Sequence, residues 1–558
     1  MKSEIMFVFL FVAVGSFATV IPNSGLTSEE QNQLMDKIKR VYSDKADSHL
    51  LDERPVKYSV QEGKVVEPNS VLKVSKAEAT LDNFERLAQK KVDSKFMDHQ
   101  CLWLKRLLPN INCEQKFRSD SWEVIEAQDR VEALTKSWMA TTEFLMDKLP
   151  IKGATSISLW SDDYWKLQWG ATSYRYGEDT YFSNYTEAIN SYLQPEFWVK
   201  SLQSLSSSQL SAQIATWSPA EKYDLIINDL NFGLTKEQKE EGRPFIDENG
   251  DVEGWMGLCH GWAAAAIMAP KAMNSFEMWG PSETKVKWFA HDVRALTTLA
   301  WSNGNFPTNF VGTRCNKKKP EIYDNGRIKD SECFDNNPGT FHLALANLIG
   351  IAKASFIMDA TFDYQVWNQP IKTYEFTYFN PLAPEKQSKN WEEVAVSYDD
   401  NFKVKDRFQT TLTRGKRKMN GSVHDDSMIS KVVGVITTVV YLGEINPIQG
   451  DAVRNENFIR VSYTYDLELA QKNGGYQVIG GEWHTNAHPD FLWVPQKNSV
   501  ALKSFDVDHL NFTGTESPSE PLSQQARKAS EYGYPLCSVI SKLLGSSAMG
   551  SQYLCHAH

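Results

Sequence analysis

One cysteine of the chain stands in a segment whose composition suits a reactive thiol. Residues 254–262 read GWMGLCHGW and are followed by four alanines. Glycine permits a tight turn and alanine favours helix, so Cys259 is predicted to lie at or near a helix N-terminus. There the helix dipole and the unpaired amides stabilise a thiolate, which is the nucleophilic form of cysteine. The alternative is a buried structural cysteine in an alanine-rich core helix.

The other six cysteines fall into local pairs. The pairs are Cys101 with Cys113, Cys315 with Cys333, and Cys537 with Cys555, each separated by 12 or 18 residues. In an oxidising compartment these pairs are expected to form disulfides. Cys259 is then left over, and an odd cysteine in a secreted protein is either an intermolecular link or a reactive thiol. This partition favours the reactive thiol.

A thiol enzyme also needs a base and a group that orients the base. His342 lies in an apolar segment, and Asp359 follows seventeen residues later in similar surroundings. A buried pair of this kind would fix the imidazole tautomer and stabilise the imidazolium. The structural alternative makes His342 a satisfied core histidine and Asp359 a cap. His488 with Asp490 is a rival base in the order of papain-like enzymes, and His291 is a further candidate.

The N-terminus is typical of a secretory signal peptide. Lys2 precedes an apolar segment of ten residues, 5–14, and small residues at 16 and 18 predict cleavage after Ala18. Ten apolar residues are too few to span a bilayer. We therefore expect a secreted, extracellular protein that has no membrane contact once the signal is cleaved. In a eukaryotic source the N-glycosylation sites would be Asn184, Asn420 and Asn511.

Length and composition place the chain among ordinary globular proteins. Its 558 residues suggest two to four domains, and its hydrophobic content is 41%. The net charge of −11 argues against a general nucleic-acid binder, which needs a basic face. The 17 tryptophans suggest aromatic-lined surfaces as well as core.

Periodicity and turn residues predict an α+β protein with a helical part before a strand-rich part. We expect a thiol-enzyme-like core in which the helix that carries the cysteine packs on an antiparallel sheet. The predicted division is a signal peptide (1–18), a charged leader or pro-segment (19–95), a helical region (96–205), a catalytic core (206–500), and a linker with a small disulfide-closed lobe (501–558).

Two helices can be placed from local signals. An acidic capping box at Asp120 and an apolar period predict a helix that Pro150 ends. Ser218 followed by proline, with Glu221 at the third helical position, predicts a second helix, and Gly233 is its expected end.

Strands dominate the second half of the predicted core. The β-branched run 432–442 predicts a buried strand, and apolar and polar residues alternate over 459–469, which predicts one buried and one wet face. Asn473 and two glycines predict a hairpin turn after that strand. The basic segment 414–418 is expected to be a solvated loop, with an exposed protease site as the alternative.

Two further motifs lie near these candidate residues. Residues 366–372 read VWNQPIK, and residues 488–493 read HPDFLW. The order of cysteine, histidine and Asp359-Ala360-Thr361 looks like the thiol constellation of transglutaminases. Together these motifs resemble the transglutaminase elicitor family, the secreted calcium-dependent transglutaminases of Phytophthora, over roughly residues 210–495.

The resemblance implies an enzyme, a protein-glutamine gamma-glutamyltransferase. Cys259 would attack the γ-carboxamide of a protein glutamine, release ammonia, and pass the acyl group to a lysine amine as an isopeptide crosslink. His342 would accept and deliver the protons, and Asp359 would orient the imidazole.

The resemblance also implies a substrate channel and external partners. The backbone amide of Cys259 and the indole of Trp255 would hold the oxyanion, and Trp262 and Trp367 would line the channel. The implied partners are protein substrates that supply glutamine and lysine. A plant immune receptor would recognise residues 366–372 as a surface peptide, and calcium is the implied cofactor.

The residues themselves signal calcium only weakly. Asp247, Asp251 and Glu253 lie in an acidic segment with a glycine, but the glycine is at the fourth position rather than the sixth, so the segment is not an EF-hand. Calcium dependence is therefore an expectation from the resemblance alone.

Two other function classes stay open. A secreted cysteine endopeptidase would use the same thiol with water as the acyl acceptor. A non-enzymatic, wall-binding secreted protein would use the aromatic residues and would not need a reactive thiol.

Overall fold

The computed structural model describes residues 130–548 with gaps, together with four short strands nearer the N-terminus; the longest gaps are 192–204, 322–332 and 502–519. Strand β1 (Leu10–Val14) pairs with β2 (Phe17–Ile21), and β3 (Ser59–Gln61) pairs with β4 (Lys64–Val66). The remainder of the predicted signal peptide and leader lies outside the described residues. So do the predicted Cys101–Cys113 disulfide and the sites Asn420 and Asn511.

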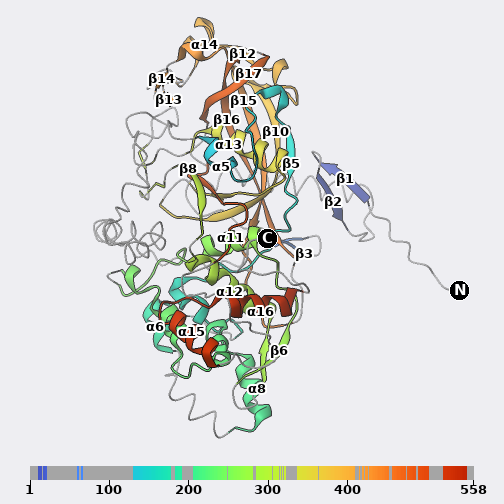
Figure 1. Ribbon diagram of the computed structural model, residues 1–558. Helices are drawn as coiled ribbons and strands as arrows, with labels where there is room; N and C mark the ends of the chain where they lie inside the picture. Colours follow the sequence, from blue (N-terminus) through green and yellow to red (C-terminus); the bar gives the residue numbers. More distant parts are fainter. Residues whose placement is uncertain are drawn as a thin grey trace, which may run out of the picture.

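An antiparallel sheet of ten strands forms one half of an elongated molecule (Figure 1). Its main path runs β17-β16-β15-β10-β9-β18-β8, and β5, β11 and β12 pair beside it. The strands are β5 (Lys152–Ala154), β8 (Thr308–Gly312), β9 (Ile357–Asp359), β10 (Asn368–Asn380), β11 (Ala383–Ser388), β12 (Val396–Ser397), β15 (Lys431–Gly443), β16 (Asn457–Lys472), β17 (Gly475–Trp483) and β18 (Phe491–Pro495).

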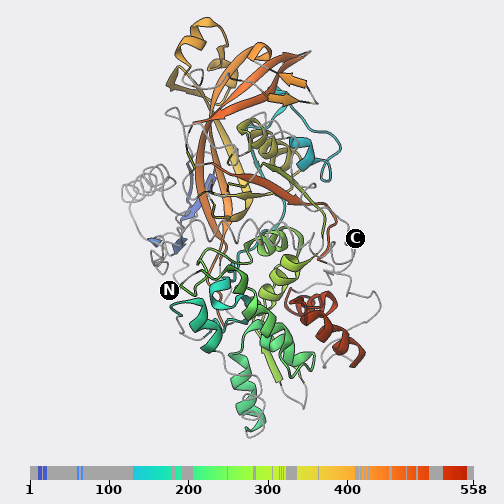
Figure 2. The same ribbon diagram turned by 90° about the vertical axis from the view of Figure 1, so that its left-hand side faces the viewer.

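Helices form the other half (Figure 2). They are α6 (Tyr185–Ser191), α8 (Ser207–Ala215), α9 (Pro219–Ile226), α10 (Gly233–Glu240), α11 (Cys259–Met268), α12 (Ala290–Asn303), α15 (Glu520–Ser530) and α16 (Cys537–Ala548), with the strand pair β6 (Phe276–Trp279) and β7 (Lys285–Trp288). The sheet half carries α5 (Val131–Thr135), α13 (Pro338–Ala344), the π-helix η9 (Leu345–Ile351), α14 (Asp400–Lys405) and the strand pair β13 (Arg417–Met419) and β14 (Ser422–His424). The expected mixture of helices and an antiparallel sheet is confirmed.

The helix predicted after Ser218 is confirmed, but its end is not. Ser218 and Glu221 form a complete capping box at the start of α9. The helix ends at Ile226, because Asn228 adopts a left-handed conformation with φ of 56°. Gly233, the predicted end, instead begins α10.

The long helix predicted up to Pro150 is wrong in its described part. Only Val131–Thr135 is α-helical, Met146–Lys148 forms a single 3-10 turn, and by residue 152 the chain has entered the sheet as β5, beside β10. Tertiary bonds outweigh the local periodicity here. The indole of Trp138 donates to the carbonyl of Pro495 at 3.0 Å, and the backbone N–H of Glu143 donates to Asn347 Oδ1 at 2.8 Å.

The predicted strands and hairpin are confirmed, with one departure. β15 covers the β-branched run, and β16 turns into β17 with Lys472 opposite Gly475. Alternate residues of β16 are buried as far as Tyr465, but Asp466 and Glu468, predicted to face water, are buried as well.

Arg414 explains that departure and corrects the prediction for its own segment. Instead of lying in a solvated loop, Arg414 is 1% exposed and forms ion pairs with Asp406 at 2.7 Å, Asp466 at 2.6 Å and Glu468 at 3.5 Å. A buried carboxylate needs such a partner, so this arginine allows both faces of β16 to be covered.

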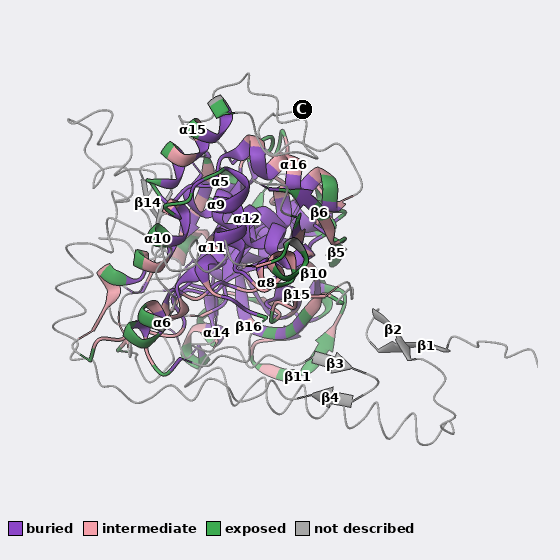
Figure 3. Ribbon diagram, turned by 90° about the horizontal axis from the view of Figure 1, so that it is seen from below, coloured by how far each residue is buried: buried purple, intermediate pink, exposed green. Residues whose placement is uncertain are grey.

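The two halves share one hydrophobic core, which extends from β10, β15 and β16 to α9, α11 and α12; the buried helices are seen in Figure 3. Side chains of the C-terminal helices, such as Leu522 and Leu543, belong to the same core. The segment predicted as a small lobe is thus packed against the helical half. Among the described residues, no helix is both long and apolar enough to cross a membrane.

The disulfide prediction holds where the structure describes both partners. Cys315 and Cys333 are bonded, and Cys259 carries a free thiol. Cys537 is also disulfide-bonded, while its predicted partner, Cys555, lies outside the described residues. Asn184 is described too, and its side chain accepts a hydrogen bond from the backbone N–H of Glu187 in the first turn of α6.

Candidate functional site

Cys259 is the first residue of α11 and is buried where this helix meets the sheet. α11 packs on α12 and touches β10 and β18. The close packing depends on Gly261, because a Cβ there would lie 2.4 Å from the carbonyl oxygen of Thr298 on α12. Gly257 makes a similar approach to Tyr164, whose carbonyl oxygen accepts the Leu258 N–H at 2.6 Å.

Two residues at or just before the start of β10 form hydrogen bonds with the thiol. The Cys259 S–H donates to the carbonyl oxygen of Val366 at 3.7 Å, and the side-chain amide of Asn368 donates to Cys259 Sγ at 3.4 Å. The indole N–H of Trp493 on β18 donates to Asn368 Oδ1 at 2.7 Å. The described surroundings of the thiol therefore contain an oriented amide, and no imidazole is hydrogen-bonded to Cys259 there.

The thiol is strongly desolvated. Cys259 is 1% exposed, and burial raises the pKa of the thiol to about 11, although the hydrogen bonds from Asn368 act in the opposite direction. In this conformation the cysteine is therefore protonated at neutral pH.

We expect the native protein to react slowly with iodoacetamide at pH 7 to 8, and the rate should rise about tenfold per pH unit up to the region of pH 11. The raised pKa of Cys259 is the reason, because only the thiolate reacts. Labelling followed by peptide mass mapping at several pH values checks this. A rate that levels off below pH 9 would contradict the described environment.

Asp359 is the last residue of β9, where it lies opposite Asn368 and close to the thiol. Its carboxyl group accepts hydrogen bonds from the loop that follows β9. Its Oδ1 accepts the N–H of Trp367 at 2.8 Å and the hydroxyl of Thr361 at 3.0 Å. We call residues 360, 361 and 364–367 the cover loop, because the carbonyl oxygen of Val366 accepts a hydrogen bond from the thiol. Burial and then the nearby Asp490 raise the pKa of the Asp359 carboxyl well above its ordinary value.

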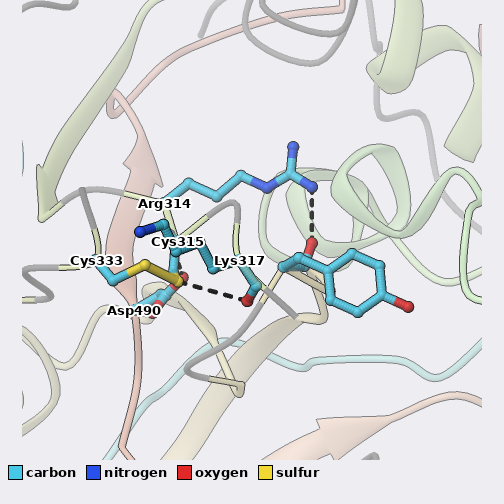
Figure 4. The surroundings of a disulfide bond; sticks show 6 residues. Arg314, Cys315, Lys317, Cys333 and Asp490 are labelled. Atoms are coloured by element: carbon cyan, nitrogen blue, oxygen red, sulfur yellow. Dashed lines mark hydrogen bonds between the residues drawn. A yellow bond between two sulfur atoms is a disulfide. The ribbon is translucent and has the colours of Figure 1, made fainter. Parts of the chain in front are cut away.

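The disulfide lies beside Asp490 (Figure 4). The Cys315 N–H donates to Asp490 Oδ2 at 2.8 Å, and Arg314 donates to the carbonyl oxygen of Tyr364 at 2.7 Å. Arg314, the residue before the disulfide-closed segment, thus binds the cover loop by a hydrogen bond.

The structure does not bring His342 to Cys259 or Asp359. Its Nδ1 is 2.9 Å from the Tyr465 hydroxyl, its ring stacks on Phe376 at 3.8 Å, and its Nε2 has no hydrogen-bond partner among the residues that the structure describes. Phe376 lies eight residues along β10 from Asn368, which corresponds to about 26 Å of extended strand. Burial lowers the pKa of His342 to about 3, so the ring is neutral.

The rival His488 lies just before β18, the strand whose Trp493 donates to Asn368. Its segment leads into β18 and carries Asp490 and Trp493. The ring stacks on Trp483 at 4.8 Å, and Nδ1 is 3.5 Å from the Pro489 carbonyl oxygen. Burial lowers the pKa of His488 to about 3.

His291 lies away from the thiol. It is paired with Asp162 at 2.7 Å near the start of α12. Gly261, two residues after Cys259, packs against Ser302. Ser302 is eleven residues beyond His291, about 16 Å along the helix.

The tryptophans predicted to serve the substrate are engaged elsewhere. The Trp255 indole donates to Glu253, so it does not point its N–H at the thiol. Trp262 is fully buried and donates to the carbonyl of Trp160. Trp367, in the cover loop, packs its ring 5.5 Å from that of Tyr164.

The acidic residues predicted as weak calcium ligands bind within the chain. Asp247 accepts the backbone N–H groups of Asn249 and Asp251, and Asp251 accepts the Gln168 side-chain amide. Across the described ranges, no group of three or more His, Cys, Asp or Glu side chains is placed to hold a metal. The three candidate acids, Asp247, Asp251 and Glu253, are thus each engaged with a donor of the chain itself.

The segment 366–372, expected at the surface, is largely buried. Val366 is 3% exposed, Trp367 1% and Ile371 0%, because the cover loop and β10 form part of the core. A receptor could reach these side chains only after the segment had left the folded core.

Asn368 and Trp493 are the residues at the thiol that sequence reasoning did not assign. Asn368 lies within the motif VWNQPIK, and Trp493 lies within the motif HPDFLW. β10 and β18 lie on either side of β9 in the sheet, and the Trp493 indole reaches the Asn368 side chain across that strand.

Comparison with known proteins shows the family of the chain. The family model described as "Transglutaminase elicitor" matches residues 130–507. The chain belongs to the transglutaminase elicitor family.

A solved structure, that of the GP42 transglutaminase from Phytophthora sojae, is similar to the chain with 17% sequence identity and a TM-score of 0.43. The match covers 73% of this chain and 99% of the other. A comparison with curated proteins gives no match.

Proposed function

We propose that this protein is a secreted transglutaminase-type acyltransferase with Cys259 as its nucleophile. The observation that carries the proposal is a free thiol at the start of α11 with a side-chain amide oriented on its sulfur. Family membership supplies the reaction class.

The proposed reaction has two balanced halves. Cys259 sulfur forms a bond to the carboxamide carbon of a protein glutamine, the C–N bond breaks, and the nitrogen leaves as ammonia with the thiol proton. A lysine amine then attacks the thioester, forms the isopeptide bond and returns a proton to the thiol. Since Cys259 is buried, residues that cover it have to move for a substrate to reach it.

An imidazole would carry the proton between these steps. His342 was predicted for this role together with Asp359, but its contacts lie with Tyr465 and Phe376. We assign the role to His488, because its segment also carries Asp490 and Trp493. Asp359 then acts as a positioning residue that holds the cover loop.

The test is the incorporation of a labelled primary amine into casein, together with ammonia release. We expect both with the wild-type protein and neither with Cys259→Ser, whose folding is checked by circular dichroism. Cleavage of casein without amine incorporation would instead support a cysteine endopeptidase.

A second candidate function is a non-enzymatic secreted protein. The observation that favours it is the buried thiol with its raised pKa and no hydrogen-bonded imidazole. A wild-type protein that is folded but inactive with every amine and glutamine donor, and a thiol that stays unlabelled, would support this candidate.

A further inference from the structure

Asn368 is a buried polar residue with both side-chain polar atoms engaged. It is 3% exposed and begins β10. Its amide nitrogen donates to Cys259 Sγ at 3.4 Å, and its oxygen accepts the Trp493 indole N–H at 2.7 Å. Because an indole is only a donor, it fixes the orientation of the amide, with the oxygen toward Trp493 and the NH₂ group toward the sulfur.

An acyl transfer at Cys259 needs hydrogen-bond donors close to the sulfur. When the sulfur attacks a carboxamide carbon, negative charge develops on the oxygen that is bonded to that carbon. Donors that bind this oxygen must therefore lie within a few ångströms of Sγ. The Asn368 amide satisfies this condition, and the N–H of Cys259 belongs to the first turn of α11, where amides lack acceptors within the helix.

We propose that the side-chain amide of Asn368 binds the oxyanion in the attack of Cys259 on a glutamine carboxamide, and that Trp493 positions that amide. Asn368 is a catalytic residue in this assignment, since it touches the reacting atoms. Trp493 acts through Asn368. The inference rests on the proposed function, and it replaces the earlier expectation that Trp255 supplies the donor.

The assignment predicts the kinetics of two substitutions. Asn368→Leu keeps a side chain of similar size and removes the donor, so kcat should fall about 10²- to 10³-fold with little change in KM. Trp493→Phe keeps most of the ring and removes the N–H, so a smaller fall in kcat is expected. In the double variant the fall should equal that of Asn368→Leu alone, because Trp493 acts only through the amide.

Matched controls separate this role from a loss of packing. Asn303→Leu removes a buried amide that donates to the carbonyl of Gly533, and Trp138→Phe removes an indole N–H that donates to Pro495. Both should keep the wild-type kcat. Thermal unfolding of all variants shows whether each is folded at the assay temperature.

The outcomes separate the inference from the function on which it rests. A Cys259→Ser variant with full activity would remove the proposed function itself. If Cys259 is required but folded Asn368→Leu keeps the wild-type kcat, the inference is wrong. Should Asn368→Leu not fold, Trp493→Phe decides: a kcat equal to that of the wild type, or no lower than that of the Trp138→Phe control, contradicts the positioning role.

Discussion

Replacement of His488 by alanine is expected to lower the rate of acyl transfer on the order of 10³-fold, whereas replacement of His342 by alanine should leave the rate per folded molecule close to that of the wild type. The loss of a positioned general base has effects of this size. His488 belongs to the segment that reaches the thiol through Trp493 and Asn368. His342 is held between Tyr465 and Phe376.

Stability and rate have to be measured separately in this comparison. His342→Ala removes a stacked ring and a buried hydrogen bond, so it should lower the free energy of unfolding. Rates are therefore normalised to the folded fraction found by urea denaturation. An inactive, folded His342→Ala together with an active His488→Ala would restore His342 as the base.

Replacement of Arg414 by methionine is expected to lower the free energy of unfolding by about 3–5 kcal/mol near pH 8, because it leaves buried carboxylates without their cation. Asp406, Asp466 and Glu468 all pair with this guanidinium. Lys403→Met is the matched control, since its pair with Asp426 is partly exposed and should contribute no more than about 1 kcal/mol.

The effect of Arg414→Met should depend on pH. Burial alone would raise the pKa of Asp466, but Arg414 and His484 lower it below its ordinary value. In the wild type this stabilisation is present above the unfolded pKa and is lost as pH falls through the folded pKa. Without Arg414 the carboxyl groups become hard to ionise in the folded state, so the loss should be smaller at pH 5 than at pH 8. Equal losses at both values in urea denaturation would contradict the buried cluster.

Features set by neighbouring residues could be predicted from the sequence. The start of α9 follows from Ser218, its proline and Glu221, since the cap is closed by residues three apart. The β-branched run in β15 and the hairpin at Lys472 and Gly475 are equally local. The Cys315–Cys333 disulfide could be predicted from cysteine spacing in an exported chain.

Contacts between distant segments could not be predicted in this way. Asn368 is 109 residues from the cysteine to which it donates, and no spacing rule connects them. The burial of Asp466 depends on Arg414, 52 residues away, which turns an alternating pattern into a strand covered on both faces. His342 fits the pattern of a catalytic histidine, yet its ring is stacked on Phe376 and its Nδ1 pairs with the Tyr465 hydroxyl, which places it in the core.

The most direct test of the central claim is the detection of an acyl group on Cys259. The wild-type protein is mixed with a glutamine-containing peptide in the absence of an amine acceptor, quenched in acid and digested for mass spectrometry. We expect the peptide that contains Cys259 to carry the donor minus one ammonia, and the adduct to disappear when a primary amine is added before quenching. Cys259→Ala should show no adduct. Crosslinked product with no adduct on Cys259, or with the adduct on another residue, would contradict the account.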